Sequence, residues 1–191
     1  MPADTPINLP GRLGSPDMTL GDDPRADPRM TAVLAELGMA GTPEPSPVNA
    51  ASSLETLLEY CDGAEPEYEM LFSLLAQDLP PIDNVDTSAH VISGIDGNDI
   101  TIFVHRPTDA GHAVPGLLHL HGGGMVILEA AGAVFQRWRS ELASAGMVVV
   151  GVEFRNGGGK HGPHPFPAGL NDCTSALEWF HANRDELGAS R

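Results

Sequence analysis

Hydrophobic residues follow a helical spacing in the first half of the chain. Over Leu54–Cys61 they recur at intervals of three and four residues, which predicts an amphipathic helix. Ser52 and Glu55 form a capping box at its start, in which each side chain satisfies a backbone amide of the other residue. A second helix is predicted over Pro66–Leu75, and Pro80 lies beyond its end. The front of the chain is therefore expected to be small and helical.

From residue 87 onward, the spacing of hydrophobic residues becomes that of strands. Hydrophobic and polar residues alternate over Ala89–Ser93 and Ile100–His105, and the turn sequence Asp96–Asn98 between them predicts an antiparallel hairpin. Leu117–Leu120 is a short apolar strand. Met147–Val152 is a nearly continuous β-branched run, which is typical of a parallel strand buried on both faces.

Two helices are predicted among these later strands. The first presents Phe135 and Leu142 on one face and ends at Gly146. The second spans Leu170–Phe180, and Gly188 is its expected stop. The resulting order β-β-β-α-β-α predicts an α/β protein with a mixed, mostly parallel sheet that is flanked by helices.

Proline content and the change of spacing divide the chain into three parts. Residues 1–30 contain six prolines and are expected to form an extended or disordered arm. Residues 31–82 form the helical segment, and residues 83–191 form the α/β core. No stretch approaches the roughly 18 apolar residues of a membrane span, and the first residues lack the features of a secretory signal. We therefore expect neither a membrane span nor secretion.

The chain is acidic, with 26 Asp and Glu against 10 Lys and Arg and a formal net charge of −16. Nucleic acid is not an expected partner, because its binding needs clustered basic residues. All eight histidines lie at residue 90 or later, so proton-transfer chemistry is expected in the later part. Cys61 and Cys173 form no CxxC pair, which favours a reducing, cytoplasmic location.

Candidate chemistry follows the strand predicted at Leu117–Leu120, where the sequence continues as His121, Gly122, Gly123 and Gly124. Glycines carry no side chain, so the N–H groups of such a loop can turn outward into a concave surface that binds anions. Acyl transfer needs such donors to stabilise the oxyanion of its tetrahedral intermediate, each by roughly 2.7–4 kcal/mol. The alternative is a flexible loop that is merely rich in glycine.

With this loop, the sequence resembles the α/β-hydrolase fold and, within it, the hormone-sensitive-lipase-like serine esterases. Leu118–Gly124 resembles that family's oxyanion strand and loop, Val152–Arg155 its next strand end, and His164–Cys173 the loop and helix start that follow. The helical segment 31–82 lies where the family has its N-terminal cap. The resemblance implies a carboxylic ester hydrolase that acts on small-molecule acyl esters and needs no cofactor or metal.

The resemblance also implies roles for individual residues. Gly122 and Gly123 would supply amides of the oxyanion hole, and Gly124 would shape the loop. His121 would anchor this loop by hydrogen bonds rather than act as a base. Arg155 would tie the end of its strand to neighbouring loops.

Two features depart from the family. The loop 156–163 is rich in glycine, whereas the family usually has a short apolar stretch there that contains proline and ends in an acid. The family's nucleophile lies in Gly-x-Ser-x-Gly at a strand-to-helix turn, and no serine of this chain has that context. Gly188–Arg191 comes nearest, and we interpret it as a helix end that leads into the next strand. The catalytic serine, acid and histidine are therefore expected after Arg191, in a C-terminal part that completes the sheet.

Three other interpretations stay open. The same fold could serve as a catalytically incomplete interaction module, and a homo-oligomer is open in either case. His119 and His121 lie on one face of a strand, as in a metal-dependent hydrolase, although catalytic zinc usually needs a third ligand. Gly157–Gly162 matches the dinucleotide pattern G-x-G-x-x-G, but the prolines that follow delay the helix that this pattern must open.

Overall fold

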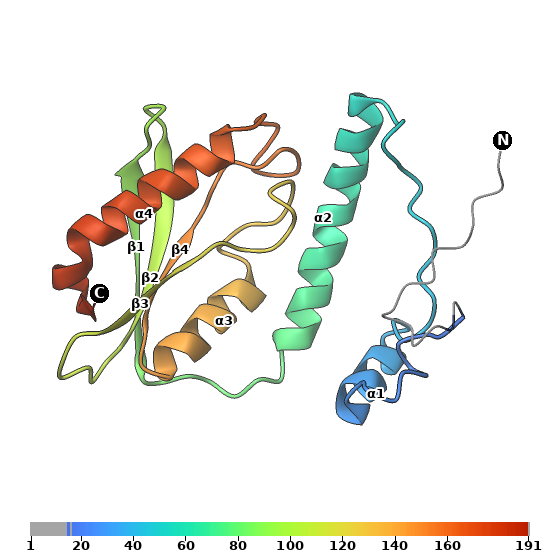
Figure 1. The fold of residues 1–191 in the computed structure, drawn as a ribbon, viewed down its shortest axis with the longest axis horizontal. Coiled ribbons are helices and arrows are strands. Elements are labelled where there is room, and N and C mark those ends of the chain that lie inside the picture. Colours follow the sequence, from blue (N-terminus) through green and yellow to red (C-terminus); the bar gives the residue numbers. More distant parts are fainter. Residues whose placement is uncertain (1–14, 16, 191) are drawn as a thin grey trace. The chain divides into compact units, whose positions relative to one another are not determined.

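The computed structural model describes residue 15 and residues 17–190 (Figure 1). The described residues fall into two compact units, which meet in sequence between Asn49 and Ala50. Of the predicted arm over residues 1–30, residues 1–14 and 16 lie outside the described residues, and its end is helical rather than extended, because a helix begins at Pro28.

The first unit contains the helix α1 (Pro28–Glu36). Asp27 caps it by accepting a hydrogen bond from the backbone N–H of Arg29 at 2.9 Å. Proline fits the first turn because the N–H that it lacks has no partner within a helix there. After the helix, the chain returns to Gly21, whose N–H donates to the carbonyl of Ala40 at 3.1 Å.

In the second unit, the two helices predicted before residue 80 form one continuous helix, α2 (Leu54–Ala76). The prediction of two helices is wrong because Pro66 lies inside α2 without ending it. Contacts on both sides of the proline hold the helix in place. Glu65 bonds to the loops beyond the sheet, and Phe72 makes an edge contact with Phe135 at 6.0 Å between ring centroids.

The predicted cap of α2 is also wrong by one residue. The hydroxyl of Ser53, rather than that of Ser52, accepts the hydrogen bond from the N–H of Thr56, at 3.1 Å. The helix begins at Leu54, so the residue directly before it occupies the capping position.

Among the described residues, the second unit is built on a five-stranded sheet with the order β1-β2-β4-β3-β5. The strands β2 and β1 pair antiparallel, as do β2 and β4, whereas β3 pairs parallel with both β4 and β5. The α/β class, the mixed sheet and the predicted hairpin are confirmed, and a strand does follow Gly188. The strands are β1 (Val85–Ser93), β2 (Asp99–Pro107), β3 (Val114–His119), β4 (Val148–Val152) and β5 (Ala189–Ser190).

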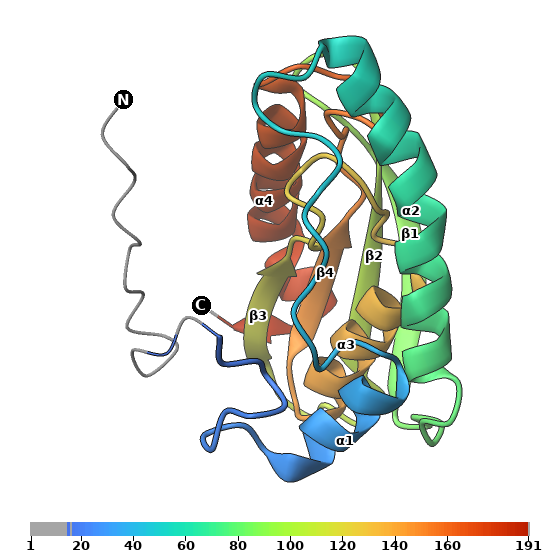
Figure 2. The same ribbon diagram turned by 90° about the vertical axis from the view of Figure 1, so that its right-hand side faces the viewer.

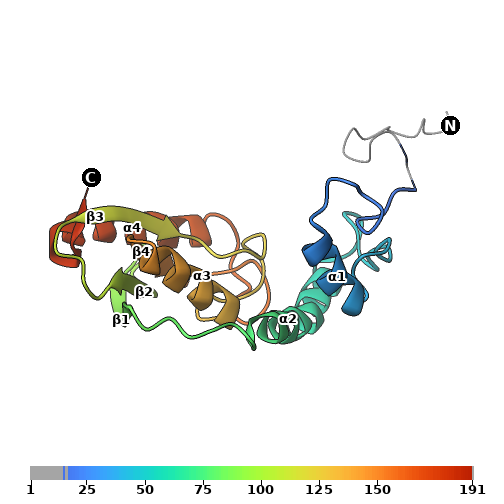
Figure 3. The same cartoon turned by 90° about the horizontal axis from the view of Figure 1, so that it is seen from below.

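Helices cover both faces of this sheet (Figure 2; Figure 3). The helix α4 (Ala168–Leu187) lies on one face, α3 (Ala133–Ser144) lies on the other, and α2 packs against α3. The face under α4 holds the hydrophobic core, because alternate residues of β2 and β4 point toward it. Its buried members include Ile100, Ile102, Val104, Val148, Val150, Val152, Cys173, Ala176 and Phe180.

The face under α3 has a different chemistry, because a fully buried arginine lies on it. Arg139 of α3 donates from Nε to Nε2 of His105 at 3.1 Å and from Nη2 to the carbonyl of Ala130 at 2.9 Å. Gly151 of β4 makes room for this side chain, since a Cβ there would lie 2.8 Å from the Arg139 Cδ. Burial lowers the pKa of Arg139 to about 10.

Among the described residues, no helix is both long and apolar enough to cross a bilayer.

The hydrogen bond between the buried Arg139 and His105 makes the free energy of unfolding depend on pH. This bond needs a neutral His105, and burial together with the Arg139 charge lowers the pKa of His105 to about 4. An unfolded histidine titrates near 6.5, so the unfolded chain binds more protons between these two values. His105 therefore makes the free energy of unfolding fall as the pH drops from about 6.5 to about 4.

Urea unfolding across this pH range tests whether His105 contributes to the pH dependence of the free energy of unfolding. We expect His105→Gln, whose amide can still accept from Arg139, to flatten the pH dependence. His112→Gln, in an exposed loop, is the control and should keep the slope of the wild type. Equal slopes for wild type and His105→Gln would contradict the assignment.

Candidate functional site

Parallel pairing places the carboxyl ends of β3 and β4 at the same edge of the sheet. We call residues 121–128, after β3, the glycine loop, and residues 153–163, after β4, the second loop. Backbone hydrogen bonds join the two, from the N–H of Gly157 to the carbonyl of Met125 and from that of Gly158 to Val126, both at 2.9 Å. The glycines predicted to carry the chemistry, Gly122–Gly124, thus lie beside the strand end predicted at Val152–Arg155.

The glycine loop is held in a conformation that requires glycine. Gly123 and Gly124 have φ values of 111° and 66°, and the Gly123 carbonyl accepts hydrogen bonds from the N–H groups of Val126 and Ile127. A Cβ at Gly123 would lie 2.1 Å from the carbonyl oxygen of Ile127, so a larger residue would displace the loop. Within the described part of the chain, the N–H groups of Gly122, Gly123 and Gly124 donate no hydrogen bond. These donors are available to an oxygen anion.

His121 supports the glycine loop from inside the protein. Its Nδ1 lies 2.7 Å from the carbonyl oxygen of Gly122, and its ring stacks on Phe154 with 4.2 Å between centroids. The residue is 5% exposed, and burial lowers its pKa, so the ring is neutral near pH 7. Its Nε2 lies 3.9 Å from Oε1 of Glu153.

Glu153 holds the segment between the glycine loop and α3 through backbone amides. Its carboxylate accepts hydrogen bonds from the N–H groups of Ala130 at 2.8 Å and Ala131 at 3.1 Å. Burial raises the pKa of Glu153. Sequence reasoning assigned no role to this residue, although an acid directly after a buried strand was a visible signal.

Glu65 of α2 is a second carboxylate that sequence reasoning missed. It is 5% exposed and accepts hydrogen bonds from the N–H of Leu128 at 2.5 Å and that of Lys160 at 2.6 Å. One side chain therefore joins α2 to the ends of both loops. Gly159 has a φ of 60° and leaves space for it, since a Cβ there would lie 2.5 Å from Oε2 of Glu65. No feature of the sequence separates Glu65 from the other acids of α2.

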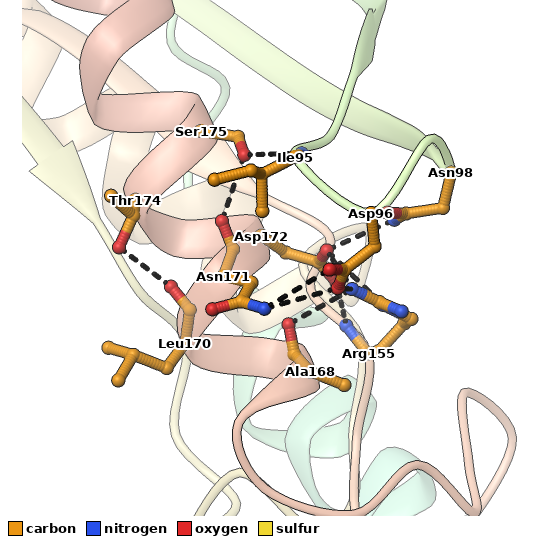
Figure 4. A network of polar contacts seen from close by, with 10 residues as sticks. All are labelled: Ile95, Asp96, Asn98, Arg155, Ala168, Leu170, Asn171, Asp172, Thr174 and Ser175. Carbon is orange, nitrogen blue, oxygen red and sulfur yellow. Dashed lines mark hydrogen bonds and ion pairs between the residues drawn. The ribbon is translucent and has the colours of Figure 1, made fainter.

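Arg155 is the centre of a polar network at the α4 side of the sheet (Figure 4). Its Nε donates to Oδ2 of Asp172 at 2.9 Å, and its Nη2 donates to Oδ1 of Asp172 at 2.8 Å and to Asp96 at 2.6 Å. The carbonyl of Ala168 also accepts from Nη2, at 3.2 Å. Asp172 is 1% exposed and accepts a further bond from Asn98. The network joins the end of β4 to the β1–β2 turn and to the start of α4.

The histidines of the metal-hydrolase alternative have different surroundings. His119 lies near Arg139, and burial together with the charge of that residue lowers the pKa of His119 to about 4. His121 instead faces Glu153. Three other groups offer metal ligands at the same edge: Glu129, Glu153 and His161 have ligand atoms within 4.8 Å of one another.

The loop that matches the dinucleotide pattern does not open a helix. After Gly162 the chain continues through several residues before α4 begins at Ala168. Gly158 packs against Cys61 of α2. A Cβ built on Gly158 would lie 3.3 Å from the Cβ of Cys61. This stretch of glycines therefore contacts α2 and does not open a helix.

Comparison with known proteins matches residues 117–191 to the α/β hydrolase fold. Carboxylesterase NlhH of Mycobacterium tuberculosis is 34% identical over 98 residues, which is 50% of this chain and 28% of that protein. Probable carboxylesterase 3 of Arabidopsis thaliana is 30% identical over 78 residues, or 40% of this chain and 24% of that protein.

Solved structures give a longer match. Brefeldin A esterase, described as a bacterial homologue of human hormone sensitive lipase, has a TM-score of 0.85 and 40% identity over 93% of this chain and 50% of its own. Esterase Est22 has a TM-score of 0.71 and 31% identity, over 90% of this chain and 50% of its own. The chain thus spans about half the length of these two structures and a smaller share of the two carboxylesterases.

The Arg155 network predicts a large effect on stability. Arg155→Met should lower the free energy of unfolding by about 3 kcal/mol, because Asp172 would remain buried without its cation. Arg184→Met is the control, since Arg184 pairs at 3.6 Å with the exposed Asp185, and it should change stability by less than about 1 kcal/mol. Urea unfolding at pH 7 measures both. Equal losses in the two variants would contradict a structural role of the network.

Proposed function

We propose that this chain, which belongs to the α/β hydrolase fold family, is the N-terminal part of a carboxylic ester hydrolase. The proteins reported above as similar are esterases or carboxylesterases. Residues 1–30 would form an arm, residues 31–82 a cap over the substrate, and residues 83–191 the first part of the hydrolase core. The substrates would be small-molecule acyl esters.

The unpaired N–H groups of the glycine loop are the observation that carries this proposal. Gly122 and Gly123 lie three and four residues beyond the end of β3 at His119, and no described group competes for their amide protons. Gly123 cannot move without losing the hydrogen bonds that its carbonyl accepts from Val126 and Ile127. Donors fixed in this way need no rearrangement when charge develops on a substrate oxygen, which makes each worth roughly 2.7–4 kcal/mol in the transition state.

The reaction would follow the serine esterase scheme. A serine hydroxyl attacks the ester carbonyl while a histidine takes its proton, and the resulting oxyanion accepts hydrogen bonds from the N–H groups of Gly122 and Gly123. Gly124 shapes the loop behind them. His121 positions the loop rather than transferring a proton, because one ring nitrogen is engaged by the Gly122 carbonyl and the ring is buried against Phe154.

The position of β5 supports a nucleophile beyond Arg191. This strand pairs parallel with the start of β3, through Val114 and Ala189. A strand that continues from β5 would run toward the edge at which the glycine loop lies. A serine at the end of that strand would therefore come beside the free N–H groups.

Activity of the full-length gene product tests the proposal directly. We expect hydrolysis of p-nitrophenyl acetate and butyrate, with covalent labelling of one serine by a fluorophosphonate. A metal-dependent hydrolase would turn over these esters without being labelled or inactivated by that reagent. Absence of turnover, or turnover that survives the reagent unchanged, would rule out the serine mechanism.

A substitution in the glycine loop tests the oxyanion role. Gly123→Ala should lower the rate of acylation by about 100-fold or more, because its Cβ would collide with the Ile127 carbonyl and turn the donors away. Gly157→Ala in the second loop is the matched control, since its Cβ meets only ordinary contacts of 3.6 Å and beyond. An acylation rate in folded Gly123→Ala within a few-fold of Gly157→Ala would show that the loop does not form the oxyanion hole.

A further inference from the structure

Four side chains from separate segments converge behind the glycine loop. His121 follows β3, Glu129 precedes α3, Glu153 follows β4, and His161 lies in the second loop. Nε2 of His161 is 3.3 Å from Oε2 of Glu129 and 3.8 Å from Oε1 of Glu153. Nε2 of His121 is 3.9 Å from that same Oε1 of Glu153. The ligand atoms of Glu129, Glu153 and His161 therefore lie within 4.8 Å of one another, and His121 adjoins this group at Glu153.

His121 is the informative member of this group. Its Nδ1 meets a carbonyl oxygen, which can only accept, so Nδ1 carries the proton and Nε2 has a bare lone pair. The side chain is 0% exposed, and Nε2 has no hydrogen-bond partner among the described residues. A buried lone pair that faces a carboxylate oxygen lacks an attractive partner. A cation between the two groups would supply one.

The surroundings of these groups resemble the outer shell of a metal site. Ligand histidines usually donate their other ring N–H to a carbonyl or carboxylate, as His121 does to Gly122. Ligand carboxylates are usually hydrogen-bonded as well, and Glu153 accepts from the amides of Ala130 and Ala131. The side chains of His121 and Glu153 are thus already oriented by backbone groups around them.

We propose that His121, Glu129, Glu153 and His161 bind one divalent transition-metal ion, for which zinc is the probe. Two nitrogen and two oxygen ligands suit zinc, whose bonds of about 2.0–2.2 Å in a tetrahedron separate the ligand atoms by about 3.4 Å. The separations of 3.3 and 3.8 Å within the group of Glu129, Glu153 and His161 need only a small contraction to reach this value, whereas His121, 3.9 Å from Glu153, would also have to approach Glu129 or His161.

The ion would act as a structural link, not as the catalyst of a metal hydrolase. It would join the glycine loop, the segment before α3 and the second loop. Through His121 it would fix the carbonyl of Gly122 and with it the N–H of Gly123, which shares that peptide plane and belongs to the proposed oxyanion hole. The ammonium of Lys160, which now lies 2.6 Å from Oε2 of Glu129, would have to yield that oxygen or share it. Lys160 is more than half exposed, so its side chain can move away.

Calorimetry on the full-length gene product tests this site independently of ester hydrolysis. After treatment with a chelator, wild type at pH 7 should bind zinc with one-to-one stoichiometry. Glu129→Gln keeps the shape of the side chain and removes its charge, and His161→Ala removes one imidazole. Each variant should weaken zinc binding by about tenfold or more, the range seen even when outer-shell partners of a metal are lost. His164→Ala removes an exposed histidine of the next segment and should leave affinity within about twofold.

Nitrogen NMR of the histidine rings provides a second readout that does not depend on a variant. Zinc should shift the Nε2 resonances of His121 and His161 and leave those of His164 unchanged. No one-to-one binding by wild type, equal affinity in His161→Ala and wild type, or an unshifted Nε2 of His121 would each overturn the proposal. Because the chain needs no substrate in these measurements, they can fail while the esterase proposal stands, and the reverse also holds.

Discussion

The parallel pairing of β3 with β4 is the constraint on which the rest of the structure depends. It brings the residues that follow His119 and those that follow Val152 to the same edge of the sheet. Every group proposed here to bind an oxyanion or a metal ion lies in or next to the two loops that leave this edge. Antiparallel pairing of the same strands would place these loops at opposite ends, and the glycine loop would lose its support.

Backbone amides, rather than basic side chains, satisfy much of the negative charge at this edge. Glu65 and Glu153 each accept two backbone N–H bonds, and the segments that donate them are the glycine loop, the segment before α3 and the second loop. A carboxylate can hold two chain segments at once because it accepts several hydrogen bonds. The arrangement has a further consequence. Since these amides are engaged and those of Gly122 and Gly123 are not, support of the loops and the proposed binding of the oxyanion use different amides.

The sequence predicted the elements of the sheet better than the contacts between them. Alternation and β-branched runs reveal strands such as β2 and β4, because burial on one or two faces acts on each residue directly. The glycine loop was also visible, since its chemistry depends on consecutive residues. Pro66 led to the wrong prediction of two separate helices. The contacts that keep α2 continuous through this proline are made by residues far away in the chain.

Buried polar groups were the least predictable part of the structure. Arg139 is fully buried although arginine is mostly exposed in proteins, and only Gly151, on another element, provides its space. The partners of Glu65 lie 63 and 95 residues away. Such contacts are set by which segments the fold brings together, and neither the spacing nor the type of the residues records them.

The same non-local contacts explain how a loop of glycines can be rigid. Glycine loses more conformational freedom on folding than any other residue, so three in succession would by themselves favour a mobile loop. Here His121 fixes the carbonyl of Gly122, and the carbonyl of Gly123 is fixed by the next turn of the chain. Glu65 then holds the far end of the loop at Leu128. With both carbonyls and the loop end fixed, the free N–H groups have few directions left in which to point, and this is the condition that stabilisation of an oxyanion requires.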